Sequence, residues 1–282
     1  MTVKNFFPQV WIARFLANLD KFLVYTTGAV VNRDYEGIVF NQGDVVRIND
    51  IGKVTVKNYT RDADIDAPEA LNDAALTMSI DQAKYFNFSL DDLDAAQANA
   101  DLMDRAMGRA AMDVRDAMDI YMAAKYTDAA AANGIGTDVA PVIPTKTDAY
   151  EYLVDLDVKL TDAKVPTEGR FCVVPPWFYG LLRKDARFIQ ATDAGQQVIA
   201  NGRIGRASNF DVLQSHNVPN TTGTKYKVVA GHPMAWSFAL GMNKIEGYRP
   251  EKRFADAVKG VVVYGGKVIR PEALAVATFN KS

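Results

Sequence analysis

The chain has 282 residues, of which 49% are hydrophobic and 23% charged, and its formal net charge at pH 7 is −2. This composition predicts a globular protein with a substantial core and excludes an intrinsically disordered chain. The near balance of acidic and basic residues argues against a protein that binds nucleic acid by neutralising many phosphates.

Residues 6–25 form an unusually apolar and aromatic segment close to the amino terminus. Trp11, Phe15, Leu19 and Phe22 recur about one helical turn apart, which predicts one aromatic face. Such a face needs a partner surface, because exposed apolar patches promote association. The segment packs either on its own domain, which is the commoner arrangement, or on a neighbouring subunit.

Two segments in which apolar and polar residues alternate follow, at residues 45–60 and 76–88. This alternation predicts two β-strands that form a hairpin. The long connection between them is acidic and contains Asp62, Asp64, Asp66, Glu69 and Asp73 beside a single arginine, Arg61. Because a two-stranded hairpin is only marginally stable alone, we expect it to lie on a neighbouring subunit.

Residues 89–126 carry the periodicity of one long helix. Its apolar stripe consists of Leu93, Ala96, Ala100, Met103, Met107, Ala110, Val114, Met118 and Tyr121. Ser89 and Asp92 fit an N-terminal cap, and a helix of this length would extend about 55 Å. The pattern fits an amphipathic or coiled-coil helix, or a structural spine that lies outside an ordinary core.

Glycines and prolines near residue 140 predict a boundary, after which helices and strands alternate. The expected elements are a helix at 148–163, a strand at 171–174, a helix that begins at Pro176, and strands at 210–215 and 227–230. This order favours a compact α/β domain. Further strands are expected at 245–248, 258–264 and 267–269 near the carboxyl end.

The sequence contains no motif that supports catalysis or metal binding. His216 and His232 lie in unrelated segments without a cysteine cluster, so their spacing predicts no metal site. The single cysteine, Cys172, could pair with a histidine as in a cysteine-dependent enzyme, but FCVV is typical of a buried strand with an inert thiol. We therefore predict no catalytic residue, no cofactor, no metal and no enzymatic activity. No apolar run suggests a membrane span or a signal peptide.

Four segments, taken in order along the chain, resemble the major capsid proteins of tailed bacteriophages, whose fold is shared with encapsulins and with herpesvirus capsid floors. The segments are VNRDYEGIVFNQGDVVRI, VPTEGRFCVVPPWFYGLL, NGRIGRASNFDVLQSHNVPN and FADAVKGVVVYGGKVIRPEAL. One departure is Ser208 and Asn209 before Phe210, where many relatives carry a glycine; we expect an altered turn and an unchanged fold.

The resemblance implies an α+β fold with five regions. They are an N-terminal arm with the entry to the P-domain (1–40), an extended E-loop hairpin (41–88), a P-domain with a spine helix (89–145), an α/β A-domain (146–243), and C-terminal strands that return to the P-domain (244–282). The resemblance also implies self-assembly, through pentamers and hexamers, into an icosahedral head shell around phage double-stranded DNA, which the subunit meets by non-specific proximity. An encapsulin-like compartment that encloses protein is the alternative within this fold, and a soluble cysteine-dependent enzyme is the alternative outside it.

The implied partners are further copies of the chain, a separate scaffolding protein, a portal and a decoration protein, without a membrane. The implied localisation is the virion, after assembly in the cytoplasm of the bacterial host. Expected contacts between subunits are the aromatic residues Trp11, Phe15 and Phe22, and the acidic residues Asp62, Asp64, Asp66 and Glu69. Their charge predicts basic partners, for which Arg183, Lys184, Arg187, Arg249, Lys252 and Arg253 are the candidates.

Overall fold

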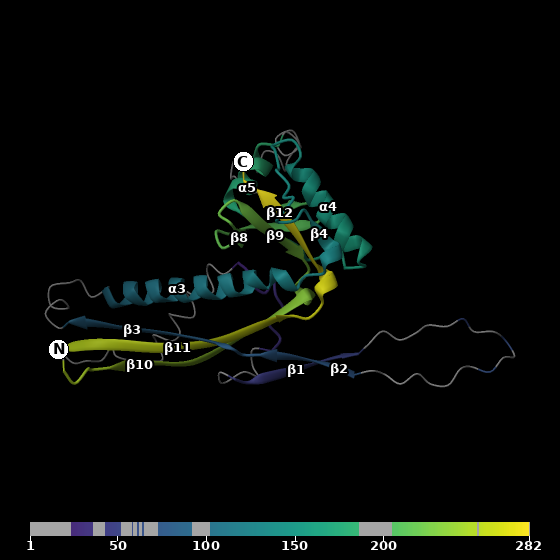
Figure 1. The fold of residues 1–282 in the computed structure, drawn as a ribbon. Coiled ribbons are helices and arrows are strands. Elements are labelled where there is room, and N and C mark those ends of the chain that lie inside the picture. The colour runs from purple at the N-terminus through teal and green to yellow at the C-terminus, as the bar shows by residue number, and fades with distance from the viewer. Residues whose placement is uncertain are drawn as a thin grey trace.

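The computed structural model describes residues 24–35, 43–51, 58, 61, 64, 73–91, 102–185, 205–252 and 254–281. Figure 1 shows two parts in these ranges: an elongated part, in which a long helix lies along long strands, and a compact part with a larger sheet and two helices. The mixture of helices and sheets confirms the predicted α+β class. Figure 1 also shows that the carboxyl end of the chain lies in the compact part.

The elongated part is built on three antiparallel strands and one helix. The elements are β3 (Gln82–Asp91), β10 (Trp236–Tyr248), β11 (Ala255–Val268) and α3 (Leu102–Ala124). The sheet order is β10-β11-β3, so β11 is the central strand. From α3, Met107, Ala111, Val114, Met118 and Met122 are buried at steps of three and four, which is the period of a helix face that packs on a sheet.

Two glycines of β11 allow this close packing. A Cβ atom at Gly260 would lie 2.4 Å from the Phe86 ring, and one at Gly266 would lie 2.3 Å from the Met122 sulfur. Both distances are far below van der Waals contact, so neither position accepts a side chain without movement of its neighbour. These glycines therefore mark close packing within a strand.

The predicted start of the long helix is wrong. Ser89 does not cap a helix, because it lies in β3 opposite Ala257 of β11. The backbone of the strand is held extended by this pairing, which competes with the local helix signal of the acidic residues that follow. The described helix α3 has 23 residues and extends about 35 Å, not about 55 Å. It ends at Ala124, where the 3-10 helix η2 (Lys125–Asp128) follows.

The predicted hairpin is present, but its second strand is shorter than expected. β1 (Val45–Ile51) pairs antiparallel with β2 (Asp73–Ser79), and these two strands form a sheet of their own. The expected strand at 76–88 is in fact two strands, since β2 ends at Ser79 and β3 pairs with β11 instead. Of residues 52–72, the structure describes Asn58, Arg61 and Asp64, which are exposed.

A small apolar cluster joins this two-stranded ribbon to the long strands. Its ribbon side consists of Val46, Ile48, Met78 and Ile80, and its sheet side of Ala239 and Val263. Because side chains alternate along a strand, Val263 faces away from Val262 and Tyr264, which belong to the larger core with α3. The ribbon and α3 therefore lie on opposite faces of the three-stranded sheet.

The compact part contains a seven-stranded sheet with the order β4-β12-β9-β5-β7-β6 and with β8 paired to β9. The strands are β4 (Gly134–Ile135), β5 (Arg170–Val174), β6 (Arg206–Ala207), β7 (Phe210–Gln214), β8 (Asn220–Thr221), β9 (Lys225–Gly231) and β12 (Leu274–Asn280). Two helices, α4 (Ala149–Asp162) and α5 (Pro176–Arg183), pack together against it, and Phe279 of β12 contacts the rings of Tyr152 and Phe178. Short 3-10 helices occur at η3 (Ala131–Asn133), η4 (Pro233–Ala235) and η5 (Pro271–Ala273).

The carboxyl-terminal segment divides between the two parts, which differs from the expected assignment of all of residues 244–282 to one region. β10 and β11 belong to the elongated part, whereas β12 pairs with β9 in the compact sheet. The expected strands at 258–264 and 267–269 are one continuous strand, β11. β12 pairs with β4 along one edge and with β9 along the other, and five of its seven residues are buried.

The turn between β6 and β7 carries the departure noted at Ser208 and Asn209. Both residues have positive φ, 48° and 64°, as required in a two-residue hairpin turn. The Asn209 side-chain nitrogen donates to Asp157 of α4 at 3.0 Å. Ser208 and Asn209 therefore form a tight turn, and the pairing of β6 with β7 is intact on both sides of it.

Candidate functional site

The described residues offer little for catalysis. Cys172 is fully buried in β5, and burial raises the pKa of its thiol, so the thiol stays protonated and unreactive. His216 is exposed, and the Nδ1 atom of His232 accepts a hydrogen bond from the Met234 amide at 3.2 Å. Within the described ranges, no group of three or more histidine, cysteine or acidic side chains could hold a metal ion. None of the helices described there has the length and apolar character of a membrane span.

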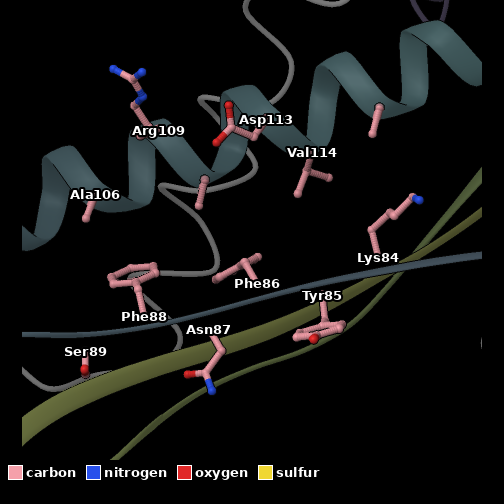
Figure 2. A pocket seen from close by; sticks show the side chains of 12 residues that line it. Lys84, Tyr85, Phe86, Asn87, Phe88, Ser89, Ala106, Arg109, Asp113 and Val114 are labelled. Atoms are coloured by element: carbon pink, nitrogen blue, oxygen red, sulfur yellow. The ribbon is translucent and has the colours of Figure 1, made fainter.

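A groove with a volume of about 610 Å³ lies between α3 and β3 (Figure 2). Its lining residues are Lys84, Tyr85, Phe86, Asn87, Phe88 and Ser89 of β3, and Ala106, Arg109, Ala110, Asp113, Val114 and Ala117 of α3. Figure 2 shows Phe86 and Phe88 pointing toward the helix, and Tyr85 and Asn87 pointing away from it. The Phe86 and Phe88 rings are nearly parallel, with centroids 6.2 Å apart. The groove can therefore take up apolar side chains, while its charged residues do not form a catalytic set.

A second feature is the root of the N-terminal arm, residues 24–32, which is bound to α3. One carboxylate oxygen of Asp119 accepts a hydrogen bond from the Val24 amide at 3.1 Å. The other accepts from the Thr26 amide at 3.3 Å and from the Thr26 hydroxyl at 3.2 Å. Asp119 is only 2% exposed, and desolvation raises its pKa, although these hydrogen bonds and the charge of Arg115 act in the opposite direction.

The same segment is bound to the start of β10. The Trp236 indole nitrogen donates to the Val30 carbonyl at 2.6 Å. The Asn32 amide donates to the Trp236 carbonyl at 3.1 Å, and the Phe238 amide donates to the Asn32 carbonyl at 3.0 Å. Residues 24–32 are therefore held by two elements, α3 and β10, that lie far apart in the sequence.

The structure describes some of the residues that the sequence predicted as contacts between subunits, and others lie outside the described ranges. Trp11, Phe15, Phe22, Asp62, Asp66, Glu69, Arg187 and Arg253 lie outside the described residues. Asp64, Arg183, Lys184, Arg249 and Lys252 are described and exposed.

The described basic candidates form two pairs that the fold does not bring together. Arg183 and Lys184 lie at the end of α5 in the compact part, whereas Arg249 and Lys252 lie in the connection between β10 and β11 at the far end of the elongated part (Figure 1). Arg249 also forms an exposed ion pair with Asp256 at 3.4 Å.

The sequence analysis missed the groove and Asp119. Nothing local distinguishes Asp119 from Asp113 and Asp116 on the same helix, because its partners lie more than 90 residues away. The groove depends on the placement of β3, whose partner strand could not be read from periodicity.

Comparison with known proteins gives matches along most of the chain. The profile of a family described as phage capsid protein matches residues 73–277. A structure of Mycobacterium phage Che8 is 28% identical in sequence, with 100% of each chain covered and a TM-score of 0.72. The capsid of Ralstonia phage GP4 is 14% identical, covers 93% of this chain and 90% of its own, and has a TM-score of 0.73.

A virus-like particle from Pyrococcus furiosus is also similar, with 12% identity, coverage of 95% of this chain and 98% of its own, and a TM-score of 0.60. At 12 to 14% identity, these last two similarities concern the fold alone. No curated protein matches the chain.

Proposed function

Because the chain belongs to the phage capsid protein family, we propose that its N-terminal arm (1–40) and its extended hairpin (41–88) join copies of it into a closed shell. The chain is a structural subunit of a phage head shell, which confirms the α+β capsid fold and the structural role expected from the sequence. The role of this family is structural, and we propose that the subunit has no enzymatic activity of its own.

The observation that carries the proposed contacts is the ribbon of β1 and β2. These two strands pair with each other and with no third strand among the described residues. The small cluster around Met78 and Ile80 anchors the ribbon on its own subunit. A two-stranded ribbon needs a supporting surface along its length, so we expect residues 52–72 to find theirs on a neighbour.

We propose that the elongated part is the P-domain and the compact part the A-domain. On this proposal the P-domain combines α3 with β3, β10 and β11, and the A-domain includes β12 as well as residues 146–235. Contacts through arms and ribbons suit a shell, since many weak contacts over a lattice give a stable container.

We further propose that the shell consists of pentamers and hexamers and encloses double-stranded DNA within the virion, after assembly in the cytoplasm of the bacterial host. A separate scaffolding protein, a portal and a decoration protein are the proposed partners. The formal net charge of −2 fits a shell that lies next to DNA but does not neutralise many of its phosphates. An encapsulin-like compartment is the second candidate, because the same fold also forms the virus-like particle of Pyrococcus furiosus.

Purified particles test both candidates. The full chain, expressed in bacteria with and without a candidate scaffolding protein, would be separated by size-exclusion chromatography and viewed by negative-stain microscopy. Closed particles support the shell, and nuclease-protected double-stranded DNA in particles from infected cells supports the head. Particles that contain a cargo protein and no DNA would favour the compartment instead.

A further inference from the structure

We propose that Asp119 is a positioning residue for shell assembly, because its buried carboxylate fixes the direction in which the N-terminal arm leaves the subunit. This inference rests on the proposed role of the arm in contacts between subunits. It adds a buried residue of the helix α3 that acts through the arm.

The geometry of the carboxylate defines one path for the chain. Val24 and Thr26 present their amides to the two oxygens of the same side chain, at 3.1 and 3.3 Å. Between them, the Tyr25 side chain is fully buried and meets the Trp236 ring edge-on, with centroids 6.4 Å apart. Amides on both sides of Tyr25 can reach one carboxylate only while the Tyr25 ring stays inside.

The next residues continue this constraint. The Val30 and Val31 amides both donate to the Thr27 carbonyl, at 2.8 and 3.0 Å, which closes a tight turn after the bound amides. The Val30 carbonyl then accepts from the Trp236 indole. Residues 24–32 are therefore held at both ends, and the described chain begins at a fixed position beside α3.

Trp236 links the arm root to the compact part of the subunit. Its ring lies parallel to that of Phe171 in β5, with an interplanar angle of 4° and centroids 5.9 Å apart. The bound segment thus lies where α3, β10 and β5 meet. A change in the position of the arm root would move contacts that connect the elongated and compact parts.

The charged groups around Asp119 are few in the described part of the chain. Arg115, one turn earlier on α3, exerts an attractive charge on it, and the charge of Asp119 in turn helps to raise the pKa of the buried Tyr25 hydroxyl. A buried carboxylate is costly unless hydrogen bonds compensate, and the donors that compensate here come from the arm root. An apolar residue at position 119 would leave the arm root without its acceptors.

Two substitutions test the proposal in the full-length chain. Asp119→Asn retains the shape but turns a donor toward an amide, and Thr26→Val removes one donor and retains the carboxylate. Asp155→Asn on α4, which replaces an exposed carboxylate, is the matched control. Hydrogen exchange of the amides of residues 24–31, the thermal unfolding midpoint of the subunit and the yield of closed particles are measured for each variant.

We expect Asp119→Asn to speed exchange of the Val24 and Thr26 amides about tenfold or more and to lower the particle yield several-fold, since each lost bond opens the root locally. Thr26→Val has a smaller effect in the same direction, and Asp155→Asn has none. Unchanged exchange in Asp119→Asn, or faster exchange with a normal particle yield, overturns the proposal. Should Asp119→Asn fail to fold, Thr26→Val decides the outcome by the same two measurements.

A double-mutant cycle with the arm separates positioning from general stability. Trp11→Ala combined with Phe15→Ala removes the proposed contacts of the arm while the root remains. If this arm variant assembles normally, the proposed role of the arm fails, whatever Asp119 does. If the arm variant gives fewer closed particles, adding Asp119→Asn should not lower the particle yield further. If the two changes lower the yield by factors that multiply, Asp119 acts through subunit stability, and the positioning role is overturned.

Discussion

Buried charged side chains connect neighbouring elements of this subunit. Arg170 is fully buried at the start of β5 and donates to the Val165 carbonyl at 2.6 Å and to the Pro166 carbonyl at 2.8 Å. Its guanidinium also pairs with the carboxylate of Asp157 and donates to the Thr161 hydroxyl at 3.0 Å, both on α4. One side chain therefore connects the helix, the loop that follows it and the strand.

Replacing Arg170 by methionine should destabilise the subunit by about 3 to 5 kcal/mol, because Asp157 would keep a charge without its partner. The matched control is Arg206→Met, which breaks an exposed ion pair with Asp211 and should cost about 0 to 1 kcal/mol. Denaturant unfolding of the purified subunit measures both. Equal losses of unfolding free energy in the two variants would show that burial does not make the Arg170 contacts more important than an exposed ion pair.

Asp119 should also leave a signature in the pH dependence of stability. Desolvation raises the pKa of its carboxyl, so the folded subunit binds this proton more tightly than the unfolded chain does. Its contribution is then most favourable below the ordinary aspartate pKa and is lost as the pH rises through the raised value. Relative to Asp119→Asn, the wild-type subunit should lose stability as the pH rises above the ordinary aspartate pKa of about 4, as measured by unfolding midpoints. If the wild-type subunit instead became more stable relative to Asp119→Asn as the pH rises, the pKa of Asp119 would be lowered in the folded state.

Among the elements, those with strong local signals were predictable and those set by distant pairing were not. Pro176 begins α5, and buried leucines at 153, 156 and 160 mark the inner face of α4, so both helices were expected where they occur. The strand β3 was mistaken for the end of a hairpin followed by a helix cap, because its alternation carries no information about its partner. The groove and the Asp119 contacts could not be predicted for the same reason, since each joins segments far apart in the chain.

The close packing of β3 on β11 gives a test at this scale. Gly260→Ala places a methyl group 2.4 Å from the Phe86 ring and should destabilise the subunit by about 1 to 3 kcal/mol, with the ring displaced toward the groove. Gly180→Ala in α5 meets no atom within 4 Å and should stabilise the subunit by up to about 1 kcal/mol. Opposite signs in thermal unfolding are expected; a stabilised Gly260→Ala would show that Phe86 does not pack on this strand.

For the whole molecule, function depends on surfaces that one subunit cannot satisfy alone. The fold of the capsid family could be inferred from four segments in their order, whereas the contacts between copies could not, because charge gives the sign of a partner and not its position. Two exposed basic pairs, one on the compact part and one on the elongated part, remain as candidates for the acidic connection.

Charge reversal distinguishes these two positions. Asp64→Lys with Asp66→Lys should lower the yield of closed particles about tenfold and leave subunit unfolding unchanged, because a small repulsion repeats at every contact of the lattice. Restoring assembly with Arg183→Asp and Lys184→Asp would place the contact on the compact part. Restoration with Arg249→Asp and Lys252→Asp would place it on the elongated part. Normal particles from the acidic double variant would refute the charge contact.

The most direct measurement is a cryo-electron microscopy reconstruction of particles formed by the full-length chain. We predict a closed icosahedral shell in which residues 1–23 and 52–72 of each copy lie against neighbouring copies. A chain that stays monomeric in the presence of its scaffolding protein, with both segments folded onto their own subunit, would contradict this account.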